Sequence, residues 1–223
     1  MTGQADDRGG HIPARLPRGP HRLPRDTVHA SQRQRILSAV LDAVGEHGYA
    51  GATMRHITAA AGVSRSAFYE LFADKQAAYL AAYDEYTAEF FGGLVSASAH
   101  IGSVAEVVDI CVDLLVRRAR EEPLRARAVN LEVYAAGPAG LTHRDQGIEI
   151  AEAVFDNLAA WLRRHDPTRP PLEPGIAKAV IAASFELCAR ALRCPEADRP
   201  AFAQAIRSIW LLGLTGTITQ AEA

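Results

Sequence analysis

The stretch TMRHITAAAGVSRSAFYELFADK, residues 53–75, constrains the fold of this chain more than any other part. It predicts two short helices, a tight turn between them and the start of a third helix. Thr53 suits an N-cap, because its hydroxyl can accept a hydrogen bond from a free amide two or three residues later. Gly62 can take the left-handed conformation that ends a helix, and Ser64 can cap the next one. Two helices joined by a short glycine-containing turn predict a helix-turn-helix, whose second helix is shaped to enter a DNA major groove.

The polar side chains of the second helix are the first candidates for DNA contact. Once the apolar positions are assigned to the core, the remaining side chains are Ser64, Arg65, Ser66 and Tyr69. Arginine can donate bidentately to guanine, and serine and tyrosine hydroxyls suit phosphates or base edges. Lys75 opens the third helix, where the free amides and the helix dipole favour an anion such as a phosphate.

The segment GVSRSAFYELFADK resembles the signature of TetR-type transcriptional regulators. It has a Gly-Val-Ser turn, a Phe-Tyr pair, an apolar residue three positions after the tyrosine, and then a lysine. The resemblance runs from about Gln34 to Leu80, and the rest of the chain matches only in length and helicity. The family implies an all-helical homodimer with an N-terminal DNA-binding domain and a C-terminal ligand-sensing domain. It also implies base contacts from Arg65 and from Arg55 in the preceding helix.

The roles expected at the DNA differ from residue to residue. Besides the two arginines at base edges, Ser66 is expected to touch a base or the backbone, and the residues expected to hold phosphates are Arg33, Thr53, Ser64, Tyr69 and Lys75. The alternative interpretation is a plain helical hairpin inside a core. Phe68, Leu71 and Phe72 are buried under either interpretation, so the two differ only in whether the polar residues are merely solvated.

Composition sets wide limits on the function. The chain has 223 residues, 48% of them hydrophobic, enough for one large or two modest domains. The formal net charge of −2 is unusual for a DNA-binding protein, but arginines crowd the N-terminal part, and a local basic footprint suffices for phosphate contact. Three cysteines without a CxxC pair indicate reduced thiols and no metal site. We expect no signal peptide and no membrane span, and therefore a cytoplasmic protein.

The helical periodicity predicts an all-α protein of about nine helices in two domains. Residues 1–30, rich in Gly, Pro and Arg, are expected to be a disordered arm that is either inert or follows DNA. Residues 31–75 are the predicted helix-turn-helix domain, and residues 76–223 the predicted ligand-sensing and dimerisation domain. A helix from Asp74 to about Phe91, ended by two glycines, would link the two domains as a rigid lever.

The helices between residues 103 and 165 are expected to enclose an apolar pocket. The candidate walls are Val108, Cys111, Leu115, Leu131, Phe155 and Leu158. The candidate polar contacts are Asn130 and Tyr134, although each could equally be an ordinary surface or core residue. No Lys or Arg falls clearly on the apolar stripes, which favours a neutral or weakly polar ligand over a strong anion.

The last two predicted helices, residues 176–192 and about 199–218, are apolar over more than one face. They are either buried within one subunit or, as the family implies, form a four-helix bundle with their copies across a two-fold axis. Trp210 and the leucines that follow it are then expected near the interface.

Together these observations predict a dimeric DNA-binding regulator and not an enzyme. It would be a repressor released from a palindromic operator by a small, mainly apolar ligand, with no cofactor and no metal. Two alternatives stay open: an α-helical enzyme with an incidental helix-turn-helix, and a DNA-binding regulator without a small-molecule ligand. The chain contains neither Gly-x-Ser-x-Gly nor His-Glu-x-x-His.

Overall fold

The computed structural model describes residues 25–98, 103–169 and 171–215, and the regular structure within them is entirely helical. The predicted all-α class with nine α-helices is confirmed for this part of the chain. In chain order the helices are α1 (Arg25–Gly51), α2 (Met54–Ala61), α3 (Arg65–Leu71), α4 (Lys75–Ser98), α5 (Val104–Glu121), α6 (Pro123–Asn130), the 3₁₀ helix η1 (Glu132–Ala136), α7 (Gly137–His165), α8 (Ile176–Ala191), the 3₁₀ helix η2 (Glu196–Asp198) and α9 (Arg199–Thr215). No helix in these ranges is both long and apolar enough to cross a membrane.

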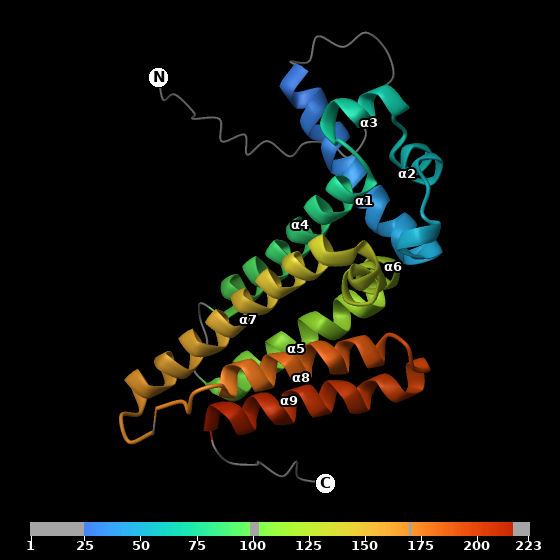
Figure 1. Ribbon diagram of the computed structural model, residues 1–223. Helices are drawn as coiled ribbons and strands as arrows, with labels where there is room; N and C mark the ends of the chain where they lie inside the picture. Colours follow the sequence, from blue (N-terminus) through green and yellow to red (C-terminus); the bar gives the residue numbers. More distant parts are fainter. Residues whose placement is uncertain (1–24, 99–102, 170, 216–223) are drawn as a thin grey trace, which may run out of the picture.

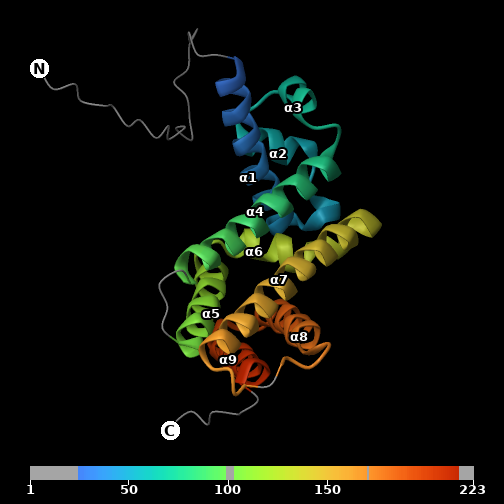
Figure 2. The same ribbon diagram turned by 90° about the vertical axis from the view of Figure 1, so that its left-hand side faces the viewer.

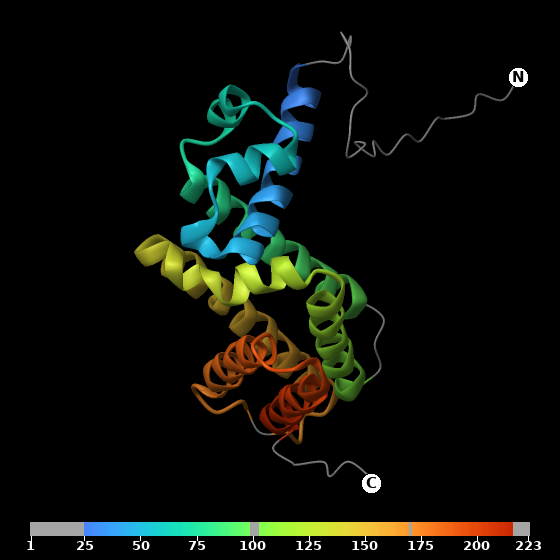
Figure 3. The same ribbon diagram turned by 90° about the vertical axis from the view of Figure 1, so that its right-hand side faces the viewer.

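The molecule is elongated, with its two ends built differently. Helices α1, α2 and α3, which we call the head, gather at one end, and α8 and α9 lie at the other (Figure 1). Helices α4 and α7 run between the two ends, and the views from either side show the same arrangement (Figures 2 and 3). We call the part from α5 to α9 the sensor half.

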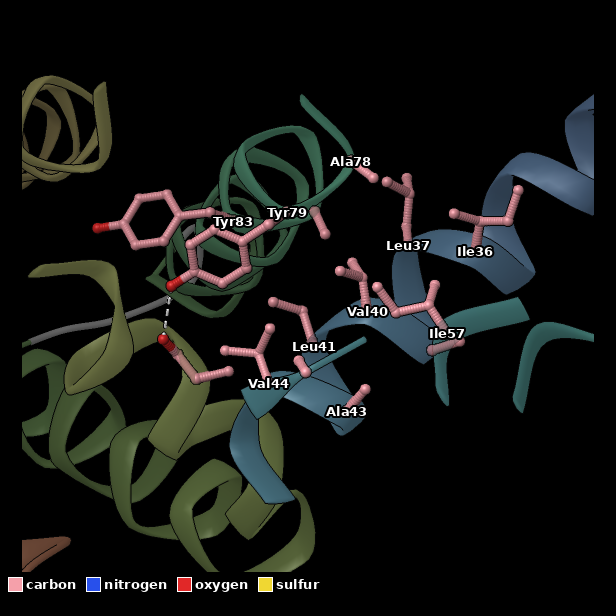
Figure 4. Packing of buried hydrophobic residues seen from close by; sticks show 14 of the residues in the cluster. Ile36, Leu37, Val40, Leu41, Ala43, Val44, Ile57, Ala78, Tyr79 and Tyr83 are labelled. Atoms are coloured by element: carbon pink, nitrogen blue, oxygen red, sulfur yellow. Dashed lines mark hydrogen bonds between the residues drawn. The ribbon is translucent and has the colours of Figure 1, made fainter. Parts of the chain in front are cut away.

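The core of the head is built on one stripe of α1. Its members recur at helical spacing and are all buried: Ile36, Leu37, Val40, Leu41 and Val44. Figure 4 shows this stripe beside Ile57 of α2 and Tyr79 of α4. Phe68 of α3 is fully buried in the same cluster. The head is therefore a continuously packed unit in which α4 takes part.

Helix α6 and η1 belong to this same core, although they lie far along the chain. Ala128 and Val133 are buried in the head cluster, and the Tyr79 hydroxyl donates a hydrogen bond to the Ala128 carbonyl at 2.8 Å (Figure 4). Helix α6 also crosses α1 closely, since a Cβ atom at Gly45 would lie 2.0 Å from the Leu124 carbonyl oxygen. A side chain at that glycine would push the two helices apart.

Polar contacts reinforce the crossing of α6 and η1 with α1. Arg125 Nε donates to Asp42 Oδ1 at 2.9 Å, and a second nitrogen of the same guanidinium lies 3.4 Å from Oδ2. The Tyr49 amide, at the end of α1, donates to Glu132 Oε2 at 2.9 Å. These bonds attach the segment 123–136 to the head.

A second apolar cluster lies between α5, α7, α8 and α9. Phe155 is fully buried there and meets Trp210 edge-on, with ring centroids 5.3 Å apart. The Trp210 indole N–H donates to the Ser184 hydroxyl at 2.9 Å, so its one polar group is satisfied. Trp210, Leu211 and Leu214 are buried within the chain. This agrees with burial within one subunit, one of the two expectations for these helices, whereas Leu212 is 42% exposed; the dimer interface stays a prediction.

Two predicted boundaries were wrong. Helix α1 begins at Arg25, so the last residues of the expected disordered arm are helical, with Asp26 in the favourable first turn; residues 1–24 lie outside the described residues. Helix α4 continues through Gly92 and Gly93 to Ser98, because a glycine costs a helix interior only about 1 kcal/mol. Helices α4, α6 and η1 contribute to the core of the head, so its packing extends past residue 75, and the division into two functional domains there stays a prediction.

Candidate nucleic-acid interface and internal cavity

Caps at both ends of α2 set the geometry of the helix-turn-helix. Thr53 Oγ1 accepts a hydrogen bond from the His56 amide at 3.3 Å, and the His56 ring nitrogen Nδ1 lies 3.4 Å from the Thr53 amide. This is a reciprocal capping box. At the other end Gly62 has φ 61° and ψ 41°, the left-handed conformation, and its amide donates to the Ala59 carbonyl at 3.2 Å. The turn that leads into α3 is thereby fixed.

Helix α3 is oriented by one buried ring. Ser64 Oγ accepts from the Ala67 amide at 3.0 Å and starts the helix. Phe68 is fully buried and lies against Phe72, with centroids 5.7 Å apart. Because Phe68 faces the core, the opposite face of α3 points outward, and Tyr69 on that face is 49% exposed.

Most of the predicted DNA contacts lie on this outward surface. The exposed members of the set are Thr53, Arg55, Ser64, Arg65, Ser66 and Tyr69. In the part of the chain that the structure describes, neither Arg55 nor Arg65 forms an ion pair, so both guanidinium groups stay available. Ser66 is 3.4 Å from the Glu70 carboxylate, which adds one negative charge to the same face.

Lys75, half-buried, and Arg33, exposed, each bind acceptors within the chain. Lys75 Nζ donates to the carbonyls of Tyr49 at 2.5 Å and Ala52 at 3.0 Å, and it lies 4.4 Å from the centroid of the Tyr49 ring. Burial lowers the pKa of Lys75. Arg33 donates to Glu85 at 2.9 Å. Their role as phosphate contacts stays a prediction, and in this structure each cation has acceptors within the chain.

The sensor half contains a cavity of about 750 Å³. It lies among α4, α5, α6, α7, α8 and α9, and most of its surface is apolar. Protein interiors are packed as densely as organic crystals and rarely hold voids larger than a water molecule. A hollow of this size is in the range of small-molecule binding sites. No group of three or more His, Cys, Asp or Glu residues that could hold a metal occurs in the described ranges.

The predicted ligand contacts divide into three groups. Cys111, Leu115 and Asn130 line the cavity. Val108, Phe155 and Leu158 belong to the surrounding apolar cluster but stand behind the lining. Leu131 and Tyr134 lie away from the cavity; Tyr134 is 50% exposed beneath the Arg144 guanidinium, which is 5.1 Å from its ring centroid. The α6 helix ends at Asn130, so the helical register that placed Tyr134 beside Asn130 does not continue.

Sequence reasoning missed the contributions of α4 and α8. Tyr86 and Phe90, four apart on α4, line the cavity, as do Ile181 and Phe185 on α8. Their i, i+4 spacing was visible in the sequence, but α4 was assigned as a lever and α8 as a dimer helix. The apolar faces of both helices serve a cavity wall instead.

Several of the polar groups at the cavity have partners within the chain. A guanidinium nitrogen of Arg118 donates to the Tyr86 carbonyl at 2.7 Å, and the group lies 4.2 Å from the Tyr86 ring centroid. Burial raises the pKa of the Cys111 thiol to about 12, so this thiol is neutral at ordinary pH. Asn130 Nδ2 donates to the Ala126 carbonyl at 2.8 Å, which leaves its side-chain oxygen as an acceptor.

The first part of the chain matches a model of a known protein family. Residues 36–82 match the model of the bacterial regulatory proteins of the tetR family. The HTH-type transcriptional repressor AcnR of Corynebacterium diphtheriae is 27% identical over 140 residues, which cover 63% of this chain and 68% of that protein. AcnR of Corynebacterium efficiens is 43% identical over 51 residues, 23% of this chain and 27% of that protein.

Solved structures resemble the whole fold. The fatty acid degradation regulator FadR of Bacillus halodurans has a TM-score of 0.70 at 17% identity, over 82% of this chain and 98% of that one. FadR of Bacillus subtilis, solved in complex with stearoyl-CoA, has a TM-score of 0.67 at 13% identity, again over 82% and 98%. At such identities the likeness concerns the fold alone.

Proposed function

The chain belongs to the TetR family of DNA-binding transcriptional regulators, and on that premise we propose that it is a repressor released from a palindromic operator by a small, mainly apolar ligand. The observation that carries the proposal is the combination of an exposed recognition helix at one end with a hollow of about 750 Å³ toward the other. The proposed place of action is the cytoplasm.

The recognition helix supplies the contacts to DNA. Arg65 at the start of α3 and Arg55 on α2 are exposed, and we assign both to base edges, where a guanidinium can donate bidentately to guanine. Ser66 contacts a base or the backbone. The hydroxyls of Thr53, Ser64 and Tyr69 hold phosphates, which position the head without reading sequence.

A homodimer would present two such heads to a near-palindromic site, since operator symmetry mirrors protein symmetry. The proposed interface is the outer face of α8 and α9. On α9 this face carries Ala201, Ser208 and Leu212, all exposed and spaced at helical intervals. Small side chains let helices approach closely, so this face suits a four-helix bundle between two copies.

The cavity favours a ligand-responsive regulator over one without a ligand. The hollow is partly open to solvent and lined mainly by apolar atoms, so an apolar occupant would remove apolar surface from water. FadR of Bacillus subtilis holds stearoyl-CoA on a similar fold, which supports a ligand site in this half.

Coupling between the cavity and the head would run through α6 as well as α4. Asn130 and Ala126 of α6 line the cavity, while Ala128 on the same helix is buried in the core of the head. A ligand that displaced α6 would thus move a helix bonded to α1. Release requires that the ligand prefer a head spacing that misfits the operator, because equal affinity for both states shifts nothing.

A gel shift with the DNA upstream of the chain's own gene tests the proposal. We expect a retarded complex that weakens steeply as salt rises, because phosphate contacts release counterions. A shuffled DNA of equal length is the control. Equal retardation of both DNAs at every salt concentration would reject sequence-specific binding, and a monomeric protein at micromolar concentration would reject the dimer.

A further inference from the structure

The residues of α9 that line the cavity differ in polarity along the helix. Four residues at helical spacing on this helix, Arg199, Ala203, Ile206 and Trp210, line it in order. Trp210 and Ile206 are buried, whereas Arg199 stands at the first position of the helix. Arg207 also lines the cavity but is paired with Asp109, so Arg199 is the cation of the α9 wall that has no ion pair within the described ranges.

Helix α5 repeats the same gradient. Cys111 and Val112 are buried on the cavity wall, and Arg118 and Arg120 line it near the C-terminal end of the helix. Helices α5 and α9 run in opposite directions (Figure 1), and the Arg207–Asp109 ion pair joins them, with Nε to Oδ1 at 2.5 Å. From that pair the C-terminal end of α5 and the N-terminal end of α9 extend the same way. Both helices thus bring arginine to the same end of the cavity.

Arg199 has a donor without an acceptor. Its Nε is buried from solvent and has no hydrogen-bond partner among the residues that the structure describes. Leaving a buried donor unsatisfied is unfavourable, and the penalty is larger for a charged group. An arginine fork matches the oxygens of a carboxylate or phosphate. Arg199 itself lines the cavity and forms no ion pair within the described ranges, so an anionic ligand group could supply the counter-charge that the chain does not.

The other charged side chains at the cavity differ from Arg199 in how available they are to an anionic ligand. Arg207 is neutralised by Asp109, and Arg118 is bonded to a backbone carbonyl and lies 3.5 Å from Glu89. Arg120 is exposed and forms no ion pair within the described ranges. Asp113 and Glu196 also border the cavity; both are exposed, as Arg120 is, so water screens all three charges.

We propose that the ligand of this cavity is an anionic amphiphile, with its apolar body between α5, α8 and α9 and a carboxylate or phosphate bound by Arg199, assisted by Arg120. This inference rests on the proposed ligand-responsive function and names the chemical class of the ligand. It replaces the expectation of a neutral ligand, which assumed that no arginine reaches the pocket. Arg199 lies at the first position of α9, in line with its apolar stripe, and Arg120 lies near the C-terminal end of α5.

The test compares probes of equal chain length and different head groups by isothermal titration calorimetry. The probes are tetradecanoate, tetradecyl phosphate and tetradecanol, the two anions below their micelle-forming concentrations and the alcohol below its solubility limit. We expect at least one anionic probe to bind about tenfold or more tightly than the alcohol, the gain of a charge-assisted hydrogen bond. Preference between the two anions then distinguishes a carboxylate ligand from a phosphate one.

Two variants test whether Arg199 causes the tighter binding of the anionic probes. In Arg199→Gln the difference between the best anion and the alcohol should fall to about twofold or less, while the alcohol binds as before, which also shows that the variant is folded. Arg190→Gln is the matched control, because Arg190 is on α8 outside the cavity and pairs with Glu186. It should leave the preference unchanged.

The outcomes distinguish a wrong ligand charge from a cavity that is not a site for such ligands. Equal binding of anion and alcohol by the wild-type chain, or an unchanged preference in Arg199→Gln, overturns the anionic assignment and leaves the ligand site intact. If none of the three probes binds, the assignment of the cavity as a site for such ligands falls as well.

Discussion

The head and the sensor half are both helical bundles with apolar cores, yet one is filled and the other is hollow. In the head, α6 approaches α1 so closely that only glycine fits at position 45, and the core residues Ile36, Val40 and Phe68 are fully buried. In the sensor half the same kinds of residue surround about 750 Å³ of free space. A filled core presents a rigid surface, whereas a hollow one can respond to an occupant.

The difference predicts unequal penalties for removing a phenyl ring. Phe68→Ala empties a site in the filled core, so we expect a loss of about 3–5 kcal/mol in the free energy of unfolding. Phe185→Ala enlarges an existing cavity and should lose about 1–2 kcal/mol, roughly the transfer free energy alone. Urea denaturation measures both. Equal losses would show that the two cores are packed alike.

Adding volume should have opposite effects in the two halves. Ala78→Leu overpacks the core of the head, where Ala78 is fully buried, and should destabilise the protein by about 1–3 kcal/mol. Ala203→Leu adds the same atoms at the cavity wall and should be neutral or stabilising. The midpoints of thermal unfolding compare the pair, and a comparable fall in both variants would contradict a hollow sensor half.

Within the head, Lys75 and Arg65 should separate stability from recognition. Lys75→Gln loses charge-assisted bonds to the Tyr49 and Ala52 carbonyls and should lower stability by about 1–2 kcal/mol. Arg65→Ala removes an exposed side chain and should change stability by less than about 0.5 kcal/mol. Denaturation curves of the two variants measure these changes in the free energy of unfolding. A stable Lys75→Gln protein with weaker binding to all DNA sequences would restore Lys75 to the phosphate contacts.

A small effect on stability is also expected at the contact between the two halves. Arg125→Gln breaks the bond to Asp42, but both side chains are partly exposed, so the stability should fall by less than about 1 kcal/mol. The change should appear instead in the response of the DNA affinity to a cavity ligand, with binding to DNA alone unaltered. The probe with the highest affinity in calorimetry serves for this comparison. An unaltered response would remove this ion pair from the coupling route.

Local motifs were readable from the sequence because their chemistry acts over a few residues. The caps Thr53, Gly62 and Ser64 and the outward face of α3 follow from hydrogen bonds and helical spacing within the motif itself. Long-range packing was not readable in this way. No local signal shows that α6 returns to α1, that Lys75 reaches the Tyr49 carbonyl, or that Arg199 borders a cavity.

The most direct test of the central claim, that the exposed arginine of the filled head reads DNA, is an anisotropy titration of the upstream operator with the wild-type chain and Arg65→Ala. Operators substituted at single positions are titrated in parallel. We predict that Arg65→Ala binds the intact operator about tenfold or more weakly, and that it no longer distinguishes substitutions at one position in each half-site. Unchanged affinity and an unchanged substitution profile in a folded Arg65→Ala protein would contradict the account.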